Sequence, residues 1–442
     1  MRPGAETVKG FSPRIMMSNA AVTSLPASYS AQPALATDWS RTLGTLLLGA
    51  LVLVPHFPLR VDEDFHFSTI DIQSILRMGL CAICGLYGLA HLQFSLGNLG
   101  RFPLAWMMLL GLWATVTVPF AIDPLQAVAT SGVLWCILLF VPAAVEILGL
   151  TRAVQTILLG STLYLVGQWV LFFTVTELGR SAEFLPNGEI VYRLGADSQQ
   201  LGLQAAALIG LVIILKRRGQ LSSNWLWLLI SLAIVTLIGA KSRTAAIGVL
   251  AGIAFIGLRR LEARRLAVLG GITAASACVI MFLFATDTAS VNVDSVAASV
   301  SRSGTAEEIT TITGRSEIWD FVLKKTSQSP VIGWGYGCAV AAGQEYEPHL
   351  RHAHNELLNA ALCLGIVGVI LTAGMFMQQI IAVCTSRDEL PLFVTVLTII
   401  AGITEPVLLL TMPTVLMILW ILVLCRAPLE APSINTPNKL CG

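Results

Sequence analysis

The sequence predicts an all-α, polytopic membrane protein with about twelve transmembrane helices and a long, partly helical outer loop. The composition supports this fold class, because 55% of the 442 residues are hydrophobic, only 12% are charged, and the mean hydropathy is +0.77. So few polar residues cannot cover a water-soluble globule of this size. The apolar residues also recur in stretches suited to crossing a bilayer.

The predicted segments follow in chain order. Residues 1–40 are rich in Ser, Ala and Pro and lack the apolar core of a signal peptide, so we expect a disordered cytoplasmic tail. Residues 41–285 form a membrane domain with spans 1–9, residues 286–352 a large outer loop, residues 353–426 a membrane domain with spans 10–12, and residues 427–442 a second cytoplasmic tail. The predicted spans are residues 42–54, 69–90, 103–121, 125–145, 154–176, 198–215, 224–240, 244–258, 266–285, 355–384, 390–404 and 407–425.

Several of these stretches are shorter than the roughly 20 residues that a perpendicular span needs. The last two are divided by Glu405 and Pro406. They are therefore either two separate spans or one broken, re-entrant pair.

Basic residues in short connections set the expected orientation, because such connections resist translocation. The strongest markers are Lys216 to Arg218 and the run from Arg259 to Arg265, which we place in the cytoplasm. An even number of spans then returns both termini to the cytoplasm. Residues 286–352 consequently lie outside.

Two other roles are disfavoured by the sequence. A net charge of +1, with basic residues scattered through the loops, gives no surface for nucleic acid. Cys81 and Cys84 have metal-like spacing, but they lie in an apolar run without a second pair, which is typical of small core residues.

Two basic clusters stand out at the outer face. Lys241 and Arg243 occupy a tight connection between two cytoplasmic markers, where positive charge is not favoured by insertion. Lys241 fits an interfacial anchor. Arg243 enters an apolar helix directly, and a charge at the membrane boundary is a candidate for function.

Arg315 begins the second cluster. It precedes a stretch in which Ile318, Trp319, Val322 and Leu323 share one face at helical spacing, which predicts an amphipathic helix on the membrane surface or the bundle. The Gly-rich run from Gly333 to Gly337 lacks the Lys-Ser/Thr ending of a phosphate loop. It predicts a tight turn in which the backbone approaches its neighbours closely.

Three of the six histidines, His349, His352 and His354, lie just before the apolar stretch 355–384. Imidazole has an unperturbed pKa near roughly 6.5, so it accepts a proton at neutral pH. The alternative is a zinc site, because His-x-His spacing occurs in metal sites and Glu345 or Glu356 could add a ligand.

A family resemblance rests on these residues. His354-Asn355, nine residues and then Gly365-x-x-Gly368-Val369 follow the pattern H-[NSQ]-x9-G-x-x-G-[TV], and this resembles bacterial O-antigen ligases. As in that family, a long outer loop with a Gly-Arg-x-x-x-Trp segment precedes the motif, here Gly314 to Trp319. The sequence SRTAAI around Arg243 is similar to the family's Arg-x3-Leu motif, with Ile247 in place of Leu.

The resemblance implies a metal-independent membrane glycosyltransferase of the superfamily shared by O-antigen ligases and polymerases. The protein would lie in the bacterial inner membrane with its active site at the periplasmic face. Its donor would be a glycan on polyprenyl diphosphate, such as undecaprenyl diphosphate, and its acceptor lipid A-core oligosaccharide in lipopolysaccharide biosynthesis. His354, Arg243 and Arg315 would be catalytic, Arg193 and Asn355 would bind substrate, and no cofactor is expected.

Other functions remain open at this stage. A polymerase of O-antigen or exopolysaccharide, or a protein O-oligosaccharyltransferase, would share the donor site and differ in the acceptor. A transporter of lipid-linked glycans would have much the same composition, although transporters commonly show internal repeats and none is visible here.

Overall fold

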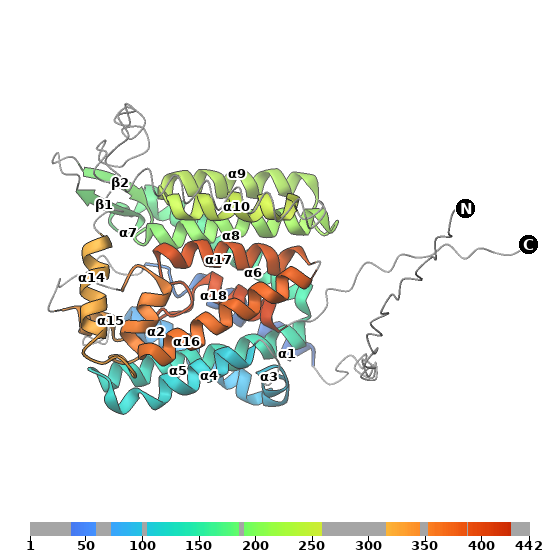
Figure 1. Ribbon diagram of the computed structural model, residues 1–442. Coiled ribbons are helices and arrows are strands. Elements are labelled where there is room, and N and C mark those ends of the chain that lie inside the picture. The colour runs from blue at the N-terminus through green and yellow to red at the C-terminus, as the bar shows by residue number, and fades with distance from the viewer. Residues whose placement is uncertain are drawn as a thin grey trace, which may run out of the picture.

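The computed structural model describes residues 37–58, 72–99, 104–184, 190–258, 315–344, 352–386 and 388–425, and these are almost entirely helical (Figure 1). The predicted tails, apart from the few residues at which α1 begins, lie outside the described residues. So do the stretch 266–285, residues 286–314 and His349.

The helices that form the bundle are α1 (Asp38–Leu53), α2 (Ile72–Ala90), α3 (Leu92–Leu99), α4 (Leu104–Val116), α5 (Pro124–Leu148), α6 (Leu150–Thr174), α8 (Ser198–Arg217), α9 (Ser223–Ala240), α10 (Arg243–Leu258), α16 (Glu356–Thr385), α17 (Glu389–Thr404) and α18 (Val415–Leu424). Shorter elements are η1 (Val118–Phe120), α7 (Thr176–Gly179), α14 (Arg315–Thr326), α15 (Ala339–Gly343) and the strands β1 (Arg180–Phe184) and β2 (Ile190–Leu194). The two strands form an antiparallel hairpin in which Ser181 pairs with Arg193.

Six of the described helices are long and apolar enough to cross a membrane, namely α2, α5, α6, α8, α9 and α16. The number rises to seven if α3 and α4, which are bent by 103°, form one broken span. The helical membrane class is therefore supported, whereas the expected twelve spans are not confirmed. Helices α10, α17 and α18 are apolar but only 10–17 residues long.

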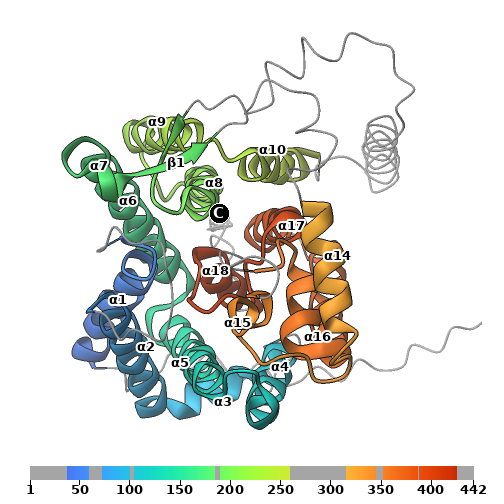
Figure 2. The same ribbon diagram turned by 90° about the vertical axis from the view of Figure 1, so that its left-hand side faces the viewer.

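Large apolar side chains remain exposed on the outside of the bundle, as expected for a protein solvated by lipid. Examples are Leu86 on α2, Leu159 on α6, and Trp227 and Ile238 on α9. The inside is packed around α18, whose ten residues are all buried. Figure 2 shows α18 near the centre, with α1, α5, α8, α16 and α17 around it. A helix that is apolar on every side is stable only when it is surrounded in this way.

The two ends of the bundle are distinct. The hairpin β1–β2 lies with α14 and α15 at one end, which we call the hairpin end (Figure 1). α8 leaves the hairpin end at Ser198 and finishes at the opposite end, where Arg217 pairs with Glu389 at 2.8 Å and Arg218 pairs with Asp388. α17 starts at these acidic residues, so it returns to the hairpin end and Glu405 lies there.

Residues 405–414 join α17 to α18 as a mostly buried, non-helical stretch, which we call the central segment. Unpaired peptide groups inside a membrane bundle are costly, so such a stretch is stable only where protein groups satisfy it. The Glu356 carboxylate accepts the backbone N–H groups of Val407, Leu408 and Leu409. The backbone carbonyl groups of the central segment accept hydrogen bonds from side chains. Asn359 donates to Leu409, Tyr336 to Leu410, His56 to Pro413 and Thr414 to Val407. The structure thus favours the broken pair over two full spans.

α16 is interrupted at Gly365, where the backbone adopts φ 65° and ψ −163°. The backbone carbonyl groups just before this break accept hydrogen bonds from donors outside α16. Leu362 and Cys363 accept the N–H groups of Trp334 and Gly335, at 2.9 Å each, and Leu364 accepts the Trp113 indole. The loop from Gly333 to Gly337 is therefore docked on the break.

The predicted tight turn in this loop is confirmed. Gly333, Gly335 and Gly337 all have positive φ, and a Cβ on Gly333 would lie 2.5 Å from the backbone of Cys363. The predicted amphipathic helix is α14, which packs beside α16 with Val322 buried and Leu323 exposed (Figure 2). The ammonium of Lys325 on α14 lies 4.6 Å from the centre of the Trp334 ring.

Candidate active site

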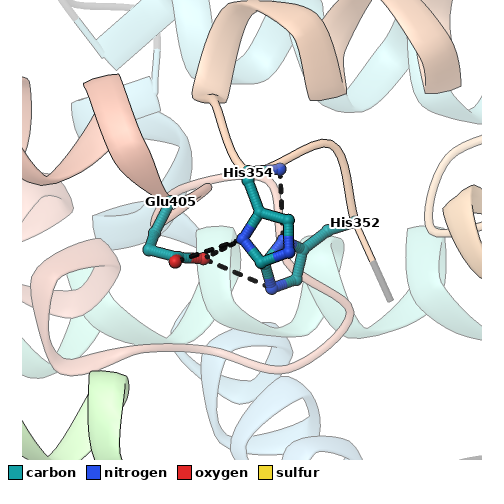
Figure 3. A group of neighbouring side chains, drawn as sticks. All are labelled: His352, His354 and Glu405. Atoms are coloured by element: carbon teal, nitrogen blue, oxygen red, sulfur yellow. Dashed lines mark hydrogen bonds and ion pairs between the residues drawn. The ribbon is translucent and has the colours of Figure 1, made fainter. Parts of the chain in front are cut away.

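His352, His354 and Glu405 form a compact cluster at the hairpin end (Figure 3). Nδ1 of His354 lies 3.2 and 3.1 Å from the two carboxylate oxygens of Glu405, and Nε2 of His352 lies 3.4 Å from one of them. The Glu405 side chain is 5% exposed, whereas that of His354 is 29% exposed. The carboxylate is therefore enclosed while the His354 ring is accessible.

The hydrogen bonds assign the protons of both rings. Nδ1 of His352 accepts the backbone N–H of His354 at 3.3 Å, so the neutral His352 ring carries its proton on Nε2, which faces Glu405. A carboxylate only accepts, so the His354 proton lies on Nδ1. Nε2 of His354 is then left as a proton acceptor.

The chain places His354 by an uncommon turn into α16. His354 has φ 50°, in the left-handed region that few residues other than glycine adopt. Asn355 then caps α16 by accepting the N–H of Leu358 at 3.0 Å, and its amide N–H binds the carbonyl of Ile403 at 3.0 Å. Asn355 thus ties the start of α16 to the end of α17, next to Glu405. A contact between Asn355 and substrate stays a prediction.

Arg243 begins α10 at the same end of the bundle, because α9 runs there from the opposite end. The hydroxyl groups of Thr244 and Thr404 are 2.9 Å apart, which joins the start of α10 to the end of α17. Arg243 and Glu405 are the sequence neighbours of these two threonines. The structure therefore brings the Arg243 position and the histidine cluster together.

Arg193 is buried and holds the neighbouring turn. Its Nε and one terminal nitrogen donate to the carbonyl of Ala240, at 3.0 and 2.9 Å. Ala240 ends α9, and Lys241 then takes a left-handed conformation with φ 51° before α10 begins. These contacts fix the turn that presents Arg243. Binding of substrate by Arg193 stays a prediction.

Arg315 is the first residue of α14, so its backbone lies at the hairpin end. Its side chain is outside the described part of the structure.

Of the described residues, His352, His354 and Glu405 are the group with the spacing of a metal site, their ligand atoms all lying within 4.8 Å of one another. The hydrogen bonds disfavour a metal, because Nδ1 of His352 already accepts an N–H and Nε2 must then hold the proton. Of the zinc ligands considered from sequence, His352 and His354 belong to this group. Glu356 binds the central segment instead, while Glu345 and His349 lie outside the described residues.

Glu405 is the functional candidate that the sequence analysis missed. In the sequence, Glu405 marks only the division between two apolar stretches. A carboxylate between membrane-buried segments is a site candidate in its own right, and this signal would have singled it out.

Residues 228–373 match the family model described as O-antigen ligase. This region belongs to the O-antigen ligase superfamily. The matched O-antigen ligase region contains Arg243, Arg315 and His354, whereas Arg193 and Glu405 lie outside it. A comparison with curated proteins finds no match. The matched region and the apolar helices together support a membrane protein with an O-antigen ligase-like region.

Proposed function

We propose that this protein transfers a glycan from polyprenyl diphosphate to a sugar hydroxyl, in O-antigen ligation to lipid A-core. The observation that carries the proposal is the cluster at the hairpin end, where His354 presents a proton-accepting Nε2 beside the start of α10 at Arg243. A base and a cation are the two groups that this reaction needs.

In the proposed reaction, the acceptor hydroxyl oxygen attacks the anomeric carbon of the donor. The bond between that carbon and the diphosphate oxygen breaks, and its electron pair leaves with the diphosphate. The hydroxyl proton passes to Nε2 of His354. Polyprenyl diphosphate is the second product, and the step needs no oxidant, nucleotide or other cofactor.

Arg243 and Arg315 are proposed to bind the diphosphate. The planar guanidinium group donates to two phosphate oxygens at once, which an ammonium group does not. Negative charge grows on the diphosphate as the bond breaks, so the two arginines stabilise the transition state more than the bound substrate. This charge stabilisation would make a metal ion unnecessary.

We also propose that the hairpin end faces the periplasm and that the protein lies in the inner membrane. The opposite end carries Lys216, Arg217 and Arg218, and clustered basic residues favour the cytoplasm.

The proposal is tested with the purified protein in liposomes, given a polyprenyl diphosphate-linked glycan and lipid A-core. We expect glycan-modified lipid A-core and free polyprenyl diphosphate in equal amounts. Elongated donor glycan would instead identify a polymerase, and glycosylated protein an oligosaccharyltransferase. Movement of the donor across the bilayer without a new glycosidic bond would identify a transporter.

Metal independence is tested in the same assay. We expect full transfer in the presence of a strong chelator, because the proposed base and clamp are side chains of the protein. Loss of transfer with the chelator and its recovery with zinc would contradict this and assign a metal to His352, His354 and Glu405.

The anion clamp is tested by replacing Arg243 and Arg315 with Lys. Each change keeps the charge but removes the paired donors, and a charge-assisted hydrogen bond contributes roughly 1.5–3 kcal/mol. We therefore expect Arg243→Lys and Arg315→Lys to lower kcat/KM about ten- to a hundredfold. Lys241→Gln is the matched control, because Lys241 is exposed two residues before Arg243 and should retain transfer. Full activity of both Lys variants would exclude the clamp.

A further inference from the structure

We infer that Glu405 is a positioning residue that keeps His354 in the tautomer able to act as a base and stabilises its protonated form. The inference rests on the proposed role of His354. It adds a residue outside the matched O-antigen ligase region, at the far end of α17.

The first argument is tautomeric. A neutral imidazole carries its single proton on either nitrogen, and only the other nitrogen accepts a proton. Both oxygens of Glu405 lie within 3.2 Å of Nδ1 of His354, so the carboxylate holds the proton there. Nε2 stays available for the acceptor hydroxyl.

The second argument is electrostatic. When Nε2 takes the hydroxyl proton, the His354 ring becomes positive, and the adjacent carboxylate of Glu405 stabilises that charge. Burial ordinarily favours the neutral acid, but here two N–H donors, from His354 and His352, face the same carboxylate. His352 therefore stabilises the ionised form of the Glu405 carboxylate through its Nε2–H. Its Nδ1 accepts the backbone N–H of His354.

The third argument is that Glu405 is held rigidly against the helix that follows His354. The central segment begins at Glu405, and its next N–H groups are bound by Glu356, the first residue of α16. Asn355 binds the carbonyl of Ile403 from the other side. The start of α16 thus forms hydrogen bonds with the chain on both sides of Glu405, through Asn355 and Glu356. These bonds fix the distance between the His354 imidazole and the Glu405 carboxylate.

Glu405→Gln in the full-length protein tests the inference. The amide can donate to Nδ1 and so stabilise the wrong tautomer, and it carries no charge. We expect kcat to fall on the order of a hundred- to ten-thousandfold, as for a triad histidine that loses its carboxylate. Donor binding, measured with a fluorescent polyprenyl diphosphate, should change little. Glu405→Asp should recover part of the activity.

The pH profile separates this role from a merely structural one. Among the described residues, the titratable and charged groups placed around His354 are Glu405 after α17, His352 in the same loop, Glu356 at the start of α16, and the Arg243 position at the start of α10. The Glu405 carboxylate lies against the His354 ring and favours its protonated form, so the acidic limb of the kcat profile should move to lower pH in Glu405→Gln. A structural defect would lower transfer equally at every pH and leave the limb in place.

Glu389→Gln is the matched control, because Glu389 is an ion-paired carboxylate at the opposite end of the same helix. It should retain both the rate and the pH profile. Unchanged kcat in Glu405→Gln, together with inactive His354→Ala, would overturn the inference and leave the proposed function intact. Normal transfer by His354→Ala would instead overturn the proposed function itself.

Discussion

His354→Ala is expected to lower glycan transfer on the order of a hundred- to ten-thousandfold while the protein remains folded in the membrane. Loss of a general base has this effect on rate. The ring is partly exposed and contacts the Glu405 carboxylate and the His352 ring, so its removal leaves no apolar cavity. The measurement is single-turnover transfer from purified polyprenyl diphosphate-linked glycan, at matched amounts of protein in the liposomes.

Two other histidine variants serve as controls. His352→Ala should be milder, because Nδ1 of His352 accepts a backbone N–H and its Nε2 faces Glu405. His91→Ala should behave as the wild type, since His91 follows α2 and binds the carbonyl of Tyr87, away from the cluster. If His352→Ala proved more damaging than His354→Ala, the base would have been assigned to the wrong imidazole.

Gly365→Ala is expected to destabilise the protein strongly and to abolish transfer. Gly365 has φ 65° and ψ −163°, a conformation that is essentially restricted to glycine and costs other residues about 1–3 kcal/mol. A Cβ at this position would also lie 2.2 Å from the carbonyl oxygen of Val331, which is backbone and cannot move aside alone. The break in α16 would therefore shift, and with it the short helical piece that follows His354.

The measurement is the melting temperature of the detergent-purified protein, followed by transfer at a temperature where both proteins are folded. Gly132→Ala on α5 is the matched control, because a Cβ there meets nothing within 4 Å and helical alanine is favoured over glycine. An unchanged melting temperature in Gly365→Ala would show that the break in α16 is not required for stability.

Much of the local structure follows from the sequence alone. The low content of charged residues predicts a helical membrane protein, and the apolar spacing after Arg315 predicts α14. The three glycines from Gly333 to Gly337 predict a close backbone approach. These features depend on neighbouring residues and on the solvent around the chain, so sequence patterns report them directly.

The number of membrane spans does not follow from the hydropathy of the sequence. Hydropathy reports only that a stretch is apolar, and it does not separate a lipid-facing helix from a buried one. α18 and the central segment are as apolar as a span, yet they are enclosed by other helices. The α16 break is likewise hidden in an apolar run, because its freed carbonyl groups are satisfied by Trp113 and by the loop at Trp334.

For the site, the sequence by itself determined which residue types are present: a histidine before an apolar helix, with arginines at membrane boundaries that resemble those of O-antigen ligases. Only the tertiary structure decided that Glu405, 51 residues after His354, faces that imidazole and that Thr404 binds Thr244. The reason is physical. A sequence motif reports groups that lie close along the chain, whereas the tautomer and basicity of a histidine depend on whichever charge the packed helices bring next to it.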